Sequence, residues 1–237
     1  MSDLTILYED NSCIAVAKPG GLLTQGVPPG IPTLESMVKA YIKEKYHKPA
    51  GVYLGIPHRL DRPVSGVVLF ARNTTAARRI AEQFQQHRVR KVYWAAVEGD
   101  VRPPEGEWED WLRKVPEEAR SEAVAPDAPG AKRAVLAYRV LGPLATGGTL
   151  LELTPRTGRM HQLRVQCAAR GHPVIGDELY GSSRTFGPPA AERRDRVIAL
   201  HARELSLEHP KGRAPLTLVA PLPEAWRGLG LPEGVEG

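Results

Sequence analysis

A ten-residue stretch, PHRLDRPVSG at 57–66, places one carboxylate among two arginines and a histidine. Asp61 lies between Arg59 and Arg62, and the apolar run VVLF follows at once. A carboxylate kept charged beside cations can stabilise developing positive charge or attack a carbon atom. A structural role, in which Asp61 caps a turn before a buried strand, explains these ten residues equally well. The rest of the sequence has to decide between the two.

A second group of polar residues occupies the stretch TPRTGRMHQLRV at 154–165. Thr157 and Gly158 permit a sharp turn, and basic or amide side chains gather around it: Arg156, Arg159, His161, Gln162 and Arg164. Arginine forks and helix N-terminal amides both favour anions, so this stretch suits phosphate and ribose contacts. Taken alone, it is also typical of a solvated, Arg-rich loop.

The sequence lacks the motifs that are typical of several other kinds of catalytic or binding site. The sequence has no phosphate-binding GxxxxGK[ST] loop, no GxGxxG, no HExxH and no paired CxxC. Ser65 is not in the GxSxG context of a nucleophile elbow, and the seven histidines are not spaced as ligand pairs. Cys13 and Cys167 are predicted to be buried thiols. We therefore expect no cofactor and no metal.

Length and composition narrow the class of protein. The chain has 237 residues, 42% of them hydrophobic, which suits one sizeable core or two small lobes, and we predict a single domain over 1–237. A net charge of +5 modestly favours an anionic partner such as nucleic acid. No apolar run is long enough to span a membrane, and the start lacks the pattern of a signal peptide. These features predict a cytoplasmic location with no membrane partner.

Hydrophobic periodicity predicts the elements that must position these residues. Strands are expected as a pair within 5–17 and then at 66–71, 90–99, 132–141, 148–155, 198–209 and 215–223. Helices are expected at 33–46, with Thr33 as N-cap, at 75–88 and at 161–171. The stretch 101–130 is predicted to be an irregular surface excursion anchored by WEDWL. Strands outnumber helices without a regular βαβ rhythm, which predicts an α+β fold with a mixed sheet.

Five motifs resemble, in the right order, those of the RluA-type RNA pseudouridine synthases. They are ILYEDNSCIAVAKPGGLLTQG, PHRLDRPVSGVVLFARN, KVYWAAVEG, TPRTGRMHQLRVQCAARGHPVIGDELYG and LHARELSLEHP. The resemblance runs from residue 5 onward, interrupted mainly at 101–130, and Val64, Gln166 and Leu207 depart from the usual residues. A separate N-terminal RNA-binding domain is not expected, because residue 5 already begins the catalytic-domain pattern.

The resemblance implies a fold and a reaction. The fold is a mixed, mostly antiparallel, bent β-sheet with flanking helices and loops and a central catalytic cleft. The reaction isomerises uridine within structured ribosomal RNA, transfer RNA or both: the N1–C1′ bond breaks, the uracil turns over, and C5 bonds to C1′. One carboxylate suffices, because the detached base rather than an activated water is the returning nucleophile. RNA is the expected partner and a monomer the expected state.

The resemblance also implies roles for individual residues. Asp61 is the catalytic carboxylate, Tyr93 stacks on the target base, and Arg164 pairs with Asp61 and keeps it charged. Arg59 enters the stack that the flipped uridine vacates. The other candidates for RNA contacts are His58, Arg62, Arg156, Arg159, His161 and Leu163. The stretch 101–130 and the basic helix at 33–48 are candidates for recognising the RNA.

Two alternatives from other classes stay open at this point. A non-catalytic RNA-binding protein on the same scaffold would not need Asp61, Tyr93 and Arg164 together. A nucleoside- or glycan-directed glycosidase would need a second carboxylate to activate water. Residue types leave three modes of action open for Asp61: attack on C1′, addition to the uracil ring, or action at C2′.

Overall fold

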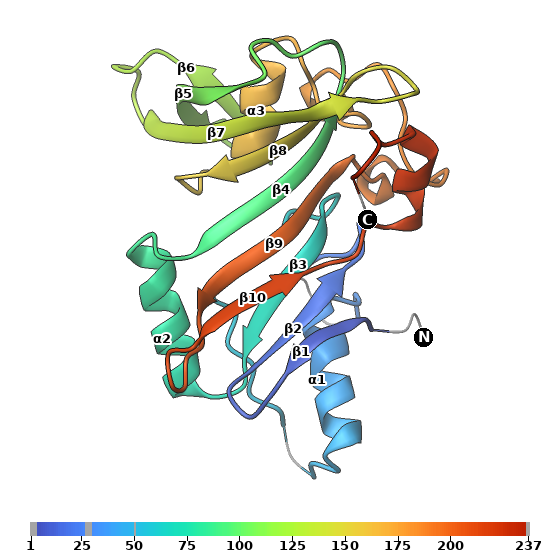
Figure 1. Ribbon diagram of the computed structural model, residues 1–237. Coiled ribbons are helices and arrows are strands. Elements are labelled where there is room, and N and C mark those ends of the chain that lie inside the picture. Colours follow the sequence, from blue (N-terminus) through green and yellow to red (C-terminus); the bar gives the residue numbers. More distant parts are fainter. Residues whose placement is uncertain (1–3, 27–29, 50, 236–237) are drawn as a thin grey trace. The chain divides into compact units, whose positions relative to one another are not determined.

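The structure of the protein is a computed structural model that describes residues 4–26, 30–49 and 51–235. The chain divides into two compact units, coloured by sequence in Figure 1. Unit 1 contains the chain up to Arg90 together with Ala202–Pro221. Unit 2 contains Lys91–His201 together with the chain from Leu222 on. The single-domain organisation over 1–237 stays a prediction.

The sheet of unit 1 carries the strand that follows Asp61. Its strand order is β1 (Ile6–Glu9), β2 (Cys13–Lys18), β3 (Ser65–Ala71) and β9 (Leu200–Glu208), and β10 (Pro215–Val219) also pairs with β9. The pairings of β1 with β2, β2 with β3, and β9 with β10 are antiparallel. Every residue of β3 is buried, as its β-branched, apolar sequence predicts.

Two helices belong to unit 1, and both begin at capping side chains. Helix α1 (Leu34–Lys45) has Thr33 as its N-cap, as predicted, with Thr33 Oγ1 accepting from Ser36 N at 3.1 Å. Helix α2 (Thr74–Gln85) begins after Asn73, whose side chain accepts from Ala76 N at 2.9 Å. The buried face of α2 joins a core built with the sheet: Cys13, Ala15, Val67, Leu69, Ala76, Ile80, Leu205 and Leu218.

The sheet of unit 2 contains the stretch for which the sequence predicts irregular structure. Its strand order is β4 (Arg90–Val97), β8 (Thr149–Pro155), β7 (Lys132–Pro143), β5 (Glu105–Lys114) and β6 (Ser121–Val124). The irregular structure predicted for 101–130 is therefore wrong, since β5 and β6 lie within it. β5 has few apolar residues, but it pairs with β7 along Glu105–Leu112, and this pairing outweighs its weak intrinsic preference. Trp108 and Leu112 are its buried side chains, which confirms WEDWL as the anchor.

The predicted third helix is α3 (Gln162–Ala168), which packs against β5 and β7 through Leu112, Ala134 and Val165. Short 3-10 turns follow at Glu178–Tyr180, Arg193–Asp195 and Glu224–Leu229. Both cysteines are buried and free, as predicted. In the described parts of the chain, no helix has the length and apolar character that a membrane span requires. The α+β fold with a mostly antiparallel sheet is confirmed, and the central cleft stays a prediction.

Candidate active site

Asp61 lies in a loop of unit 1 whose backbone is fixed from two directions. Thr24, only 2% exposed, donates through Oγ1 to Leu60 O at 3.0 Å and accepts from Leu60 N at 3.3 Å. Val64 N donates to the carbonyl oxygen of Asp61 at 3.1 Å, closing the turn before β3. The carboxylate is thus carried by a loop held in one geometry, which is what a catalytic group requires.

Lys18 is a buried cation that joins this loop to the KPGG turn after β2. Its ammonium donates to three carbonyl oxygens, those of Pro19 at 2.9 Å, Leu22 at 2.7 Å and Arg62 at 3.1 Å. Burial lowers the pKa of Lys18 to about 7, while the negative charge of Asp61 acts in the opposite direction. Three acceptors match the three N–H donors of an ammonium group, so Lys18 holds both segments together.

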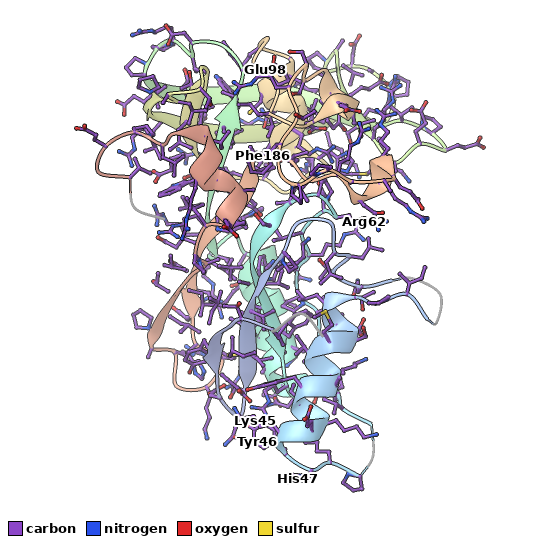
Figure 2. All side chains as sticks on the ribbon, turned by 90° about the vertical axis from the view of Figure 1, so that its right-hand side faces the viewer. Lys45, Tyr46, His47, Arg62, Glu98 and Phe186 are labelled. Atoms are coloured by element: carbon purple, nitrogen blue, oxygen red, sulfur yellow. The ribbon has the colours of Figure 1, made fainter. Side chains whose placement is uncertain are left out.

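The three basic residues around Asp61 have different surroundings. Arg62 Nε donates to Gly21 O at 2.8 Å, and Arg62 is labelled in Figure 2. His58 Nε2 accepts from Leu69 N at 2.9 Å, and its ring stacks on Phe84. Both residues therefore support the loop, and their RNA contacts stay predictions. Arg59 is exposed, as a side chain that enters an RNA stack must be.

Gly66 sets the distance between β3 and β9 within unit 1. Its φ is +124°, in a region that favours glycine. A Cβ at this position would lie 2.3 Å from Ala202 O and 2.5 Å from Ala202 N. The glycine in the SG dipeptide is thus required by the close approach of the two strands.

In unit 2, Arg164 forms a buried ion pair with Asp177. Nε lies 2.5 Å from Asp177 Oδ2 and Nη2 lies 2.7 Å from Oδ1, and both side chains are at most 5% exposed. The guanidinium also stacks over the ring of Tyr180 at 4.9 Å. Asp177 uses two of the five N–H donors, so Arg164 has the chemistry to bind a second carboxylate. Asp61 belongs to the other unit, and its pairing with Arg164 stays a prediction.

The TGR turn before α3 is shaped by Gln162. Its Oε1 accepts from Thr157 Oγ1 at 2.8 Å and from Arg159 N at 3.0 Å, and its Nε2 donates to Val135 O. The arginine side chains of this stretch are bonded at the surface: Arg156 pairs with Glu107 at 2.7 Å, and Arg159 Nε donates to Arg133 O at 3.0 Å. Their RNA contacts would have to coexist with these bonds or replace them.

The remaining predicted residues also belong to unit 2. His161 has a left-handed backbone, with a φ of 53°, and its Nδ1 lies 2.8 Å from the Tyr180 hydroxyl. Leu163 is 8% exposed, and Tyr93 is half-buried on β4, opposite Leu153 of β8. One connected group therefore contains His161, Tyr180 and Arg164. Three residues of the site region were not identified from the sequence alone: Lys18, Asp177 and Tyr180. Their only signals were the KPGG and GDELYG motifs.

One group of side chains has the composition of a metal site. Ligand atoms of Asp10, Cys13 and His209 lie within 4.8 Å of one another in unit 1. Asp10 Oδ1 accepts from the amides of Ser12 and Cys13, and Oδ2 lies 3.1 Å from His209 Nε2. These contacts join the β1–β2 turn to the β9–β10 turn without an ion. The expectation of no metal stays a prediction.

The C-terminal end of α1 displays aromatic and basic side chains together, with Lys45, Tyr46 and His47 labelled in Figure 2. Glu9 anchors them, since its carboxylate accepts from Tyr41, Lys45 and Tyr46 at 2.6–2.9 Å. These bonds lower the pKa of Glu9 against the opposing effect of burial. Tyr46 nevertheless stays 42% exposed, so this end of the basic helix is available to a partner.

Comparisons with known proteins identify the class. The profile of the RNA pseudouridylate synthase family matches residues 12–169. The chain therefore belongs to this family and isomerises uridine in RNA to pseudouridine. Among its relatives, tRNA pseudouridine synthase C of Vibrio cholerae is 34% identical over 239 residues, covering 95% of this chain and 94% of that protein. The dual-specificity RNA pseudouridine synthase RluA of Haemophilus influenzae is 36% identical over 217 residues, covering 87% and 88%.

Solved structures agree with this assignment. The human RNA pseudouridylate synthase domain-containing protein 4 superposes with a TM-score of 0.73 at 26% identity, covering 93% of this chain and 89% of that one. The corresponding domain-containing protein 1 gives a TM-score of 0.69, also at 26% identity. The predicted RluA-type family, pseudouridine synthase fold and isomerase activity are confirmed.

Proposed function

We propose that this chain modifies a uridine in transfer RNA and that Asp61 carries out the chemistry at the ribose. The choice of RNA is supported by the relatives named tRNA pseudouridine synthase C, which align over almost the whole chain. The role of Asp61 is supported by one structural observation, the loop that Thr24 and Lys18 hold in place around it. Because transfer RNA is its proposed substrate, the protein would act in the cytoplasm. We take a monomer as its default state in this proposal.

The proposed reaction needs no net oxidation and no water in the product. The target nucleotide leaves its stack, and Arg59 fills the gap. The N1–C1′ bond breaks while the Asp61 carboxylate stabilises the positive charge that develops on the ribose. The uracil turns over on Tyr93, C5 bonds to C1′, the proton on C5 is lost to solvent, and N1 regains one.

In this proposal Arg164 pairs with Asp61 and is itself positioned by Asp177. The bidentate contact with Asp177 fixes the plane of the guanidinium, so its remaining donors face a defined direction. Charge-assisted hydrogen bonds from these donors would keep Asp61 ionised. His161 contributes indirectly, by contacting the tyrosine that stacks on Arg164.

The test measures loss of the C5 hydrogen. Transfer RNA is labelled with tritium at uridine C5, taken from cells that lack the gene, and incubated with the enzyme. We expect wild type and Asp100→Asn, which changes an exposed carboxylate, to release tritium at the same rate, and Asp61→Asn to release none. Full activity of Asp61→Asn would refute its catalytic role.

A parallel map of pseudouridine in cellular RNA tests the substrate. Deletion of the gene should remove pseudouridine from transfer RNA, and a plasmid carrying wild type, but not Asp61→Asn, should restore it. A site lost only from ribosomal RNA would contradict the proposed substrate and leave the chemistry intact. If no site is lost, the non-catalytic RNA-binding alternative gains support.

A further inference from the structure

Lys91, the first residue of unit 2, is a cation whose charge no described residue compensates through a hydrogen bond or an ion pair. Its side chain is partly buried on β4, and burial lowers its pKa. Within the described residues it forms no hydrogen bond and no ion pair. Desolvated charges in proteins are normally paired, because removing an ammonium group from water without a partner is unfavourable. A lysine kept in this state indicates a partner that arrives from outside.

Three arginines in the predicted site segment of the same unit differ from Lys91 in this respect. Arg156 is paired with Glu107, Arg159 donates to the carbonyl of Arg133, and Arg164 is paired with Asp177. An incoming anion would have to compete for these side chains with protein groups already bound to them. At Lys91 it meets no such competition from a described residue.

Lys91 lies two residues before Tyr93, the residue proposed to stack on the target base, on the same strand. In β4, Val92 is 3% exposed and faces the core, while Lys91 and Tyr93 are partly exposed on the opposite side. Residues two apart on one strand face lie about 7 Å apart. A nucleotide spans a similar separation, from its base across the ribose to its phosphate. A base on Tyr93 would therefore bring a phosphate of its own strand to Lys91.

The TGR turn leaves space for such a phosphate. A Cβ built on Gly158 would meet Lys91 Nζ at 4.0 Å and nothing closer. Glycine at this position thus keeps the ammonium group uncovered beside an exposed backbone turn. A larger side chain here would crowd the same space.

We propose that Lys91 binds a backbone phosphate of the RNA strand that carries the target uridine, next to the nucleotide whose base stacks on Tyr93. This inference rests on the proposed function, since it adds a contact to the same substrate. Lys91 is a substrate-binding residue in this scheme and takes no part in breaking or forming bonds.

The experiment compares Lys91→Met, Lys91→Arg and the control Lys132→Met, which removes an exposed lysine of the same unit. Tritium release from labelled transfer RNA gives kcat and KM at several salt concentrations. We expect Lys91→Met to raise KM about tenfold, the usual effect of one lost charge-assisted contact, with kcat close to wild type. For this variant, the slope of log kcat/KM against log salt concentration should be smaller in magnitude by about 0.7, since one fewer phosphate is neutralised. Lys91→Arg and Lys132→Met should keep the wild-type KM and slope.

Thermal unfolding separates this role from a structural one. Lys91→Met should melt at or above the wild-type temperature, because it removes a desolvated charge that is paired with no described residue. An unchanged KM and salt slope in Lys91→Met would overturn the proposal, and so would a loss confined to kcat. If wild type itself releases no tritium from transfer RNA, the proposed function fails, and the salt slope of transfer RNA binding still decides for or against Lys91.

Discussion

At the scale of single residues, two buried charges position the groups that the sequence singles out. Lys18 ties the Asp61 loop to the turn after β2, and Asp177 holds Arg164 through two short bonds. Neither charge is exposed to solvent, so each depends on its partners for compensation. Removing one partner therefore weakens the compensation of a charge that stays buried.

Asp177→Ala tests this dependence. We expect it to lower the free energy of unfolding by about 3–5 kcal/mol, because the Arg164 guanidinium stays buried without its carboxylate. Urea unfolding measures the loss. The matched control is the double variant Arg164→Met/Asp177→Leu, which should recover most of the stability and have no activity. A stability of Asp177→Ala equal to wild type would show that the pair has no structural role.

The candidate site could be predicted in part from the sequence. Asp61, Tyr93 and Arg164 carry recognisable chemistry in recognisable motifs. The contact of Arg164 with Asp177 could not be predicted from the sequence, which predicts a pairing of Arg164 with Asp61. That pairing stays a prediction. Sequence order holds no information about which carboxylate a guanidinium meets after folding. The same reason explains Lys91, because its lack of a partner among the described residues is a property of the folded surroundings.

At the scale of elements, the approach of β3 to β9 constrains the residue at position 66. The left-handed backbone of Gly66 and its contact with the Ala202 backbone leave no room for a side chain. Since Asp61 lies on the loop that enters β3, any shift of this strand also shifts the carboxylate that we propose to be catalytic.

Gly66→Ala should destabilise the protein by about 3 kcal/mol or more, since backbone strain and the clash with β9 add together. Gly51→Ala is the matched control, because a Cβ at Gly51 has no atom within 4 Å. Thermal unfolding of the two variants should show a marked drop in melting temperature for the first and little change for the second. Equal melting temperatures would contradict the close packing of β3 and β9.

Elements with a strong hydrophobic periodicity were predicted correctly from the sequence. The region 101–130 was not. The buried strand β3 and the helices α1 and α2 have apolar residues at the spacing of their own structure. β5 and β6 carry mostly charged residues and become strands through pairing, including cross-strand ion pairs such as Arg133 with Glu109. Long-range pairing of this kind leaves a weak local signal.

At the scale of the whole molecule, each of the two units buries one thiol, Cys13 in unit 1 and Cys167 in unit 2. Burial raises the pKa of Cys13 and of Cys167 to about 12. An unfolded thiol ionises near pH 8.5. Above that pH the folded chain keeps a proton that the unfolded chain loses, so the stability contributed by each thiol declines as pH rises toward 12.

Cys167→Ala should reduce the decline of folding stability at alkaline pH. Between about pH 9 and 11 one thiol contributes a decline of about 1.4 kcal/mol per pH unit, and the variant should lack that part of the slope. Urea unfolding at a series of pH values compares the two slopes, and measurements near pH 7 correct for the smaller side chain. If both proteins lose stability equally with pH, the thiol of Cys167 is not protected from ionisation by the fold.

The order in which the chain supplies unit 1 has a consequence for its synthesis. β9 neighbours β3, yet the two strands are separated in the chain by the bulk of unit 2. While the ribosome is still making residues 91–201, SGVVLFA of β3 has emerged without the neighbour that will cover its edge. An apolar, unpaired strand edge is prone to intermolecular association. The newly made protein would therefore pass through an aggregation-prone stage that ends only when β9 has been synthesised.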